Sequence, residues 1–220
     1  MLLSMNVIEL FSSIDGEGKR QGFLTTFLRL HDCNIRCSYC DTLYSYGPES
    51  TFESMSVQAV ADVIEQLENH RITITGGEPL LQEPAIIELI DELTRRNARY
   101  DFNIETNGTI IPSFHRDNVW FTYDYKTPSS LAEDAMNLDI FKVATPADII
   151  KFVVGSMQDL DRMNEILTTY PTDAQIFVSP VWGNIEGATI IEYMKAHDWQ
   201  NVRFQLQIHK FIWDPDAKGV

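Results

Sequence analysis

The 220-residue chain has only three cysteines, and its basic residues are scarce beside the acidic ones. Lysine and arginine number 17 against 32 aspartates and glutamates, which gives a formal net charge of -15. A nucleic-acid-binding surface needs clustered lysine and arginine to neutralise phosphates, so this balance favours a small-molecule substrate over nucleic acid. An odd and small number of cysteines also excludes a disulfide framework for a protein of this size.

The sequence also lacks a long apolar run, a low-complexity tract and an obvious linker. The first residues, Met1 to Met5, have neither the basic region nor the apolar stretch of a signal peptide, and Met1 and Met5 both remain candidate start sites. We therefore expect a cytoplasmic protein with no membrane partner, and a single domain over residues 1–220, because 44% hydrophobic residues suffice for one core.

What the chain does have is all three cysteines in one octet, Cys33-Asn-Ile-Arg-Cys37-Ser-Tyr-Cys40. A four-iron cluster usually takes four thiolates, so three would leave one iron open to a ligand that is not protein. Two other interpretations stay open. The thiols can be small buried hydrophobic groups, or His31 can complete a Cys3His zinc site in an interaction module without catalysis.

Strand and helix patterns alternate along the rest of the chain. Ser56 is a candidate N-cap for a helix whose apolar residues recur at helical spacing. Alternation of this kind favours parallel strands joined by right-handed crossovers, hence an α/β fold. The polar stretch from Tyr44 to Ser56 is expected to be a loop over the site. The expected strands cover residues 23–30, 71–75, 102–105, 119–123, 149–154, 175–179 and 202–206, and the expected later helices cover 84–96, 159–170 and 187–197.

The cysteine spacing, followed by Gly76-Gly77-Glu78-Pro79 directly after the strand-like residues 71–75, resembles the radical S-adenosylmethionine (SAM) superfamily. The resemblance implies a partial (β/α)6 TIM-like barrel with its site at the carboxyl ends of the strands. It also implies a 4Fe-4S cluster on three thiolates, with S-adenosyl-L-methionine on the fourth iron.

Further segments resemble the 7-carboxy-7-deazaguanine synthase family, and the resemblance runs from about residue 7 to the end of the chain. This implies a lyase that converts 6-carboxy-5,6,7,8-tetrahydropterin to 7-carboxy-7-deazaguanine with loss of ammonia, towards queuosine. It also implies Mg2+, a homodimer and an electron donor such as flavodoxin or ferredoxin. The segments are Glu9 to Gly18, Phe27-Leu-Arg29, Cys40-Asp-Thr42, Glu105-Thr-Asn-Gly108 and Gln207-Ile-His-Lys210.

The same resemblance assigns residues to the cluster, to magnesium and to the cofactor. Cys33, Cys37 and Cys40 would ligate the cluster, and the Thr42 hydroxyl would be a hard oxygen ligand for magnesium. The expected cofactor-binding residues are Tyr39, Cys40, Asp41, Gly77, Asp124, Tyr125, Lys126, Ser179, Pro180, Val181 and Trp182.

For the substrate, Arg29 would hold a carboxylate, and a glutamate suits the N-H donors of the pterin edge. Two residues depart from the family pattern: Asp15 stands where the family usually has glutamine, and Asp124 where it has serine. A glycyl-radical activating enzyme, which acts on a partner protein, is the alternative function. The expected substrate-binding residues are Ile14, Asp15, Gly16, Glu17, Arg29, Thr75 and Val220.

Overall fold

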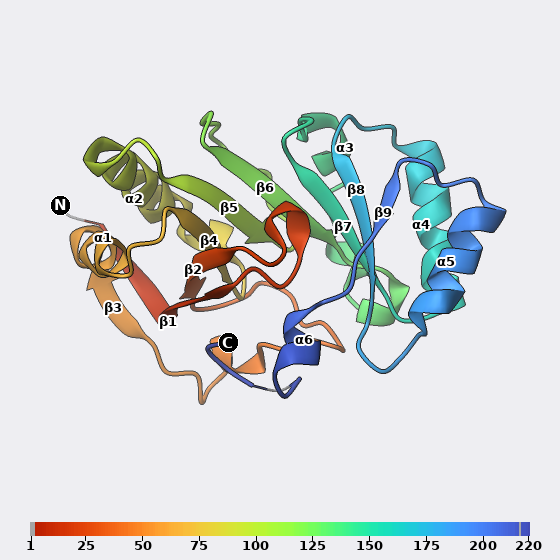
Figure 1. Ribbon diagram of the computed structural model, residues 1–220, viewed down its shortest axis with the longest axis horizontal. Coiled ribbons are helices and arrows are strands. Elements are labelled where there is room, and N and C mark those ends of the chain that lie inside the picture. The colour runs from red at the N-terminus through yellow and green to blue at the C-terminus, as the bar shows by residue number, and fades with distance from the viewer. Residues whose placement is uncertain (1–2, 216) are drawn as a thin grey trace.

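One curved sheet of nine strands forms the centre of the protein, as the computed structural model shows for residues 3–215 and 217–220 (Figure 1). The strand order is β3-β1-β2-β4-β5-β6-β7-β8-β9. The strands are β1 (Ser4–Ile14), β2 (Leu24–Leu30), β3 (Glu53–Ser56), β4 (Arg71–Gly76), β5 (Asp101–Thr106), β6 (Val119–Tyr125), β7 (Ile149–Val154), β8 (Gln175–Pro180) and β9 (Val202–Phe204).

From β2 onward through β4 to β9 every neighbouring pair of strands is parallel, whereas β1 pairs antiparallel with both β2 and β3. The long helices lie on the convex side of the sheet (Figure 1). They are α1 (Val57–Gln66), α2 (Glu83–Arg96), α4 (Met157–Thr169) and α5 (Gly187–Ala196), and the short α3 (Ile140–Val143) and α6 (His209–Ile212) complete the set.

Strand residues alternate between a helix-facing side and the concave side of the sheet. In β6, Phe121 and Tyr123 belong to the apolar core under the helices, whereas Thr122 and Asp124 face the concave side. Because the strands are parallel and in register, polar residues at their carboxyl ends gather at one end of the half-barrel. Helix α1 begins where the Ser56 hydroxyl accepts from the Ala59 N-H, as the N-cap pattern predicts.

The open side of the half-barrel, between β1 and β9, is spanned by side chains and a loop. The Gln205 side chain accepts from the Gly18 N-H at 2.7 Å and donates to the Gly18 carbonyl at 2.9 Å. The Ile208 N-H donates to the Gly16 carbonyl at 3.0 Å. The loop after β1 is therefore tied to the segment after β9, although the two strands are not paired.

Three details differ from the sequence-based expectation. The long strand β1 was not anticipated. Residues 53–56, expected in a loop over the site, form β3 and pair with β1 at the sheet edge, so only the residues before them can reach the site. The last strand ends at Phe204 and not at residue 206, and the side chain of the next residue, Gln205, bonds Gly18. Among the described residues no helix is both long and apolar enough to cross a membrane.

Candidate functional site

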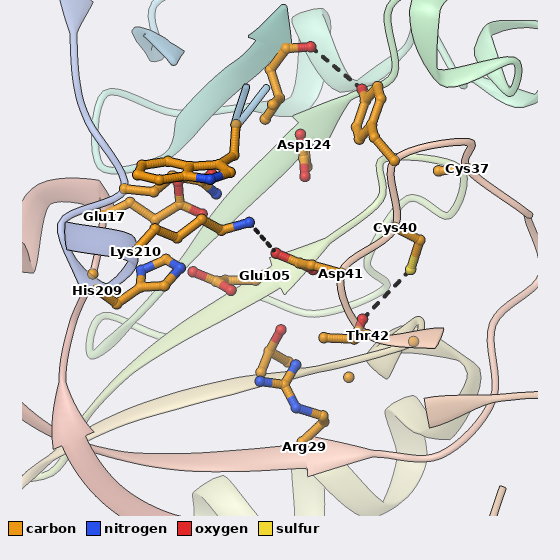
Figure 2. Close-up of a pocket in the computed structure, with 18 of the residues that line it drawn as sticks. Glu17, Arg29, Cys37, Cys40, Asp41, Thr42, Glu105, Asp124, His209 and Lys210 are labelled. Carbon is orange, nitrogen blue, oxygen red and sulfur yellow. Dashed lines mark hydrogen bonds and ion pairs between the residues drawn. The ribbon is translucent and has the colours of Figure 1, made fainter. Parts of the chain in front are cut away.

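A cavity of about 780 Å³ opens at the carboxyl ends of the parallel strands. Its walls come from the loop after β1, the cysteine loop, the ends of β4 to β7 and the C-terminal segment. Figure 2 shows Glu17, Glu105, Asp124 and Arg29 around the same space, with the loop of Cys37, Cys40 and Thr42 along one side. The expected cluster, magnesium and substrate residues therefore all lie on this cavity's wall.

The cysteine loop is held in place by backbone and side-chain hydrogen bonds. The Cys33 N-H donates to Asp32 Oδ1 at 2.8 Å, and the Arg36 guanidinium donates to the Cys33 carbonyl at 2.6 Å. The Ser38 N-H donates to the Ser130 carbonyl at 2.9 Å. These contacts bring three free thiols, none in a disulfide, to one side of the cavity.

The thiol chemistry fits an iron–sulfur cluster. Burial raises the pKa of Cys33, and it raises the pKa of Cys37 to about 11, so both are thiols until a metal displaces the proton. In the described part of the chain no three Cys, His, Asp or Glu side chains converge on the position of a single metal ion. A cluster that takes one thiolate per iron does not need such convergence, whereas a single zinc ion with Cys3His ligands does.

The glycine pair after β4 packs against the cysteine loop. A Cβ atom on Gly76 would lie 2.3 Å from the Leu30 carbonyl oxygen, and one on Gly77 would lie 2.0 Å from that of Asp32. These glycines therefore let two backbone segments touch, and a side chain at either position would push them apart. Gly77 itself lines the cavity.

Glu78 joins this turn to the loop after β5. Its carboxylate is fully buried and accepts from the Leu80 N-H at 2.9 Å, the Thr106 hydroxyl at 2.9 Å and the Asn107 N-H at 2.7 Å. Asn107 in turn places its side-chain amide 3.7 Å from Cys33 Sγ. The two segments that resemble known motifs, residues 76–79 and 105–108, thus form one unit behind the cysteine loop.

Arg29 reaches the cavity from β2 with its orientation set by a carboxylate. Its Nε donates to Glu9 Oε1 at 2.6 Å, and the Tyr44 hydroxyl donates to the same oxygen at 2.8 Å. Since Glu9 engages Nε, the outer nitrogens of the guanidinium remain for a ligand. Thr42 lies nearby with its hydroxyl 3.7 Å from Cys40 Sγ, and Thr75 also lines the wall.

Asp15, one of the two departures from the family pattern, lines the cavity but is only 2% exposed. Its Oδ2 is 3.5 Å from Arg20 Nε and accepts from the Thr73 hydroxyl at 3.2 Å. Burial raises the pKa of Asp15 to about 6, with the Arg20 charge opposing that shift. The aspartate is therefore accommodated by the protein's own cation.

Several cavity residues were not assigned from the sequence. Glu105, from β5, lines the cavity, and burial raises its pKa to about 7, with Lys151 opposing and the Glu17 and Asp15 carboxylates adding to the shift. His209 packs on Gly16, where a Cβ atom would lie 2.0 Å from His209 Nδ1. The inward parity of strand residues could have identified Glu105, because it shares the concave side with Thr122.

Lys210 is another such residue, and its ammonium lies 3.2 Å from Asp41 Oδ2 (Figure 2). The C-terminal segment continues along the cavity as far as Val220, which lines the wall as expected. The terminal residues therefore form part of the site and not a separate element.

Three of the expected cofactor residues do not line the cavity. Tyr125 lies on the helix-facing side of β6, where its hydroxyl donates to Glu133 Oε1 at 2.9 Å and its ring packs near Phe152. Ser179 is 1% exposed and its hydroxyl has no hydrogen-bond partner among the residues described. Pro180 is also absent from the wall, whereas Val181 and Trp182 are on it with Tyr39, Asp41, Asp124 and Lys126.

Comparison with known proteins agrees with this arrangement. Residues 29–150 match the family model of the radical SAM superfamily. A 7-carboxy-7-deazaguanine synthase of Clostridium acetobutylicum is 37% identical over 99% of this chain and 100% of its own length. Those of Methanospirillum hungatei and Leptospira interrogans are each 36% identical, over 96% and 99% of this chain and 86% and 99% of theirs.

The fold has a counterpart among solved structures. The crystal structure of QueE from Escherichia coli superposes with a TM-score of 0.69 at 23% identity, covering 92% of this chain and 93% of that one. Together with the family match, this confirms the predicted partial (β/α)6 barrel of the radical SAM type.

Proposed function

This chain belongs to the 7-carboxy-7-deazaguanine synthase family of the radical SAM superfamily, and from that premise we propose its reaction. The chain is a radical SAM lyase that converts 6-carboxy-5,6,7,8-tetrahydropterin to 7-carboxy-7-deazaguanine with loss of ammonia, a step towards queuosine. A reduced 4Fe-4S cluster with bound S-adenosyl-L-methionine supplies the one-electron chemistry that starts the reaction.

The main support for this proposal is that candidate cluster ligands and candidate substrate-binding groups line the same cavity. Three free thiols lie on one side, as a cluster requires, while the opposite walls carry Arg29 and several carboxylates. Arg29 offers a planar donor pair to the substrate carboxylate. Glu17 and Glu105 offer acceptors to the N-H groups of the aminopyrimidine ring.

The cofactor lies, in this proposal, between the cysteine loop and β6. Gly77 lies against the cysteine loop, where a Cβ atom on it would be 2.8 Å from Cys33 Cβ. Asp124 accepts hydrogen bonds from ribose hydroxyl groups. Buried Asp124 Oδ1 has no hydrogen-bond partner in the described ranges, which suits it to a ligand that donates. Tyr39, Val181 and Trp182 complete that side.

The proposal also covers the metal ion, the domain organisation, the assembly, the electron donor and the cellular compartment. Thr42 ligates Mg2+, supported by its hydroxyl on the cavity wall beside the cysteine loop. Residues 1–220 act as one domain, supported by the continuous sheet. The protein is a homodimer reduced by a flavodoxin or ferredoxin, as the family resemblance implies. It works in the cytoplasm, where free thiols stay reduced.

One experiment tests the function directly. The anaerobically reconstituted protein is incubated with S-adenosyl-L-methionine, a reductant, Mg2+ and 6-carboxytetrahydropterin, and the deazapurine is followed by its absorbance and mass. Product formation without any added protein substrate is expected. Cofactor cleavage that proceeds only with a partner protein would instead support the glycyl-radical activating enzyme, and zinc in place of iron and sulfide would reject both enzymes.

A further inference from the structure

A buried lysine lies between the two halves of the cavity. Lys151, on β7, is 5% exposed and lines the cavity wall. Its ammonium is 2.6 Å from Glu17 Oε1, on the substrate side, and 3.9 Å from Asp124 Oδ2, on the cofactor side. Asp124 and Lys151 are register partners on adjacent parallel strands, so their side chains leave the sheet in the same direction.

The two carboxylates that share this lysine each keep one oxygen free. Glu17 Oε2 and Asp124 Oδ1 are buried and have no hydrogen-bond partner within the described residues. Buried acceptors without partners are rare in folded proteins, and ordered water or a ligand that donates hydrogen bonds normally satisfies them. The lysine therefore holds one oxygen of Glu17 and lies near one of Asp124, while the other oxygens remain for ligands.

Positive and negative side chains alternate in space from Lys126 through Asp124 and Lys151 to Glu17. Lys126 holds Asp124 Oδ2 at 2.8 Å, so Asp124 already has a close cation, and Lys151 is closer to Glu17. Burial disfavours the charged form of Lys151, but Glu17, Asp124 and Glu105 outweigh it and raise its pKa, so Lys151 stays a cation. Lys151 is thus the cation within 4 Å of both carboxylates, while Lys126 holds Asp124 alone.

We infer that Lys151 is a positioning residue that couples substrate binding to cofactor binding by dividing its charge between Glu17 and Asp124. This inference rests on the proposed function for the identity of the two ligands. When N-H donors of the pterin partly neutralise Glu17, its hold on Lys151 weakens. The ammonium then moves towards Asp124 and orders that carboxylate for the ribose. By thermodynamic reciprocity each ligand tightens the other by the same factor.

The test measures binding and not turnover. Anaerobic calorimetry on the cluster-reconstituted protein gives the affinity for S-adenosyl-L-methionine with and without 6-carboxytetrahydropterin, and the converse. In the unmodified protein each ligand should tighten the other, roughly 5- to 150-fold, the usual range for coupled sites. In Lys151→Met that factor should fall towards one, whereas Lys151→Arg, which keeps the charge, should retain most of it.

Lys19→Met is the matched control. Lys19 is a partly buried lysine on the same loop as Glu17, but it donates to the Ala147 carbonyl, stacks over Trp120 and does not line the cavity. Lys19→Met should leave the coupling factor unchanged. This control distinguishes a general loosening of the loop after β1 from the specific loss of the Lys151 ammonium between Glu17 and Asp124. Full coupling in Lys151→Met would overturn the inference.

A second arm does not depend on Lys151→Met folding or on the pterin. Glu17→Gln removes the charge closest to Lys151 altogether, a larger change than the partial neutralisation by bound substrate, so it should tighten S-adenosyl-L-methionine binding by roughly 5-fold or more. Unchanged or weaker cofactor binding would overturn the lysine link. Failure of the unmodified protein to bind the pterin would instead overturn the proposed function, and the Glu17→Gln arm would still decide the role of Lys151.

Discussion

Replacing Glu78 by glutamine should destabilise the protein through a single unsatisfied N-H group. Glu78 Oε1 accepts from the Leu80 N-H and the Thr106 hydroxyl, and Oε2 accepts from the Asn107 N-H. A glutamine has only one acceptor oxygen. The glutamine orientation of lower energy places its oxygen where Oε1 was, so the bonds from Leu80 and Thr106 remain. Its NH2 group then faces the Asn107 N-H, and two donors meet without an acceptor.

The magnitude follows from that geometry. A buried donor left without an acceptor costs about 1–3 kcal/mol, and bonds to a carboxylate lie at the upper end. Burial raises the pKa of Glu78, against the hydrogen bonds from Asn107, Leu80 and Thr106, so removing the charge recovers part of that cost. We expect a net loss of about 2 kcal/mol in the free energy of unfolding.

Urea denaturation of the metal-free protein measures this change, since a bound cluster would add its own stabilisation. Glu83→Gln is the control, because both oxygens of the Glu83 carboxylate also accept, from the Ser113 N-H at 2.7 Å and its hydroxyl at 2.9 Å, but these two bonds are exposed to solvent. Its loss should be about 0.5 kcal/mol. Equal losses in the two variants would refute the reasoning that Glu78 is a buried support of the site.

Three further predictions concern residues around the cavity. Arg29→Met should weaken 6-carboxytetrahydropterin binding by about 2–5 kcal/mol, because the substrate carboxylate loses its buried partner, while 5'-deoxyadenosine release without substrate persists; equal loss of both would move Arg29 out of the substrate site. Thr42→Ala should abolish the stimulation of turnover by Mg2+ and Thr42→Ser should retain it, in a titration of rate against Mg2+; unaltered stimulation in Thr42→Ala would contradict the ligand role. The pKa of Asp15, raised from 3.8 to about 6, means that the folded state holds its proton more tightly. Its contribution to stability should be full below about pH 4 and should fall by about 3 kcal/mol as the pH rises past 6. The difference in unfolding free energy between the native protein and Asp15→Asn across this window measures that change, and a flat difference would exclude the raised pKa.

Local patterns predicted the parallel part of the sheet well. Residues 71–75 and 149–154 are short apolar runs bounded by turn signals, and the structure confirms them as β4 and β7. Ser56 marked the start of α1 because an N-cap is a local interaction. Strands β1 and β3 were missed, and β3 is the edge strand, paired antiparallel to β1. Their pairing joins residues about fifty positions apart, such as Ser4 and Ser56, which no local pattern records.

Strand parity would have corrected one site assignment. Asp124 and Lys126 both face the cavity, so Tyr125 between them must face the helices, as it does. A run of adjacent residues taken from a family motif does not distinguish the two sides of a strand. The same parity applies to Glu105, the first residue of another such run, because it is the register partner of the cavity-lining Thr122 on β6.

The sequence by itself determined the chemistry of the cluster side. Three thiols within eight residues and a glycine pair directly after a strand are local features. They can be interpreted from the sequence alone, because they do not depend on which distant residues lie nearby. Only the tertiary structure decided which distant residues face these thiols across the cavity. Lys151 and Glu17 are 134 positions apart, yet their charged groups are 2.6 Å from each other. The physical reason is that parallel strands end at the same edge of the sheet, and the loop after β1, tied to Gln205, folds back over that edge.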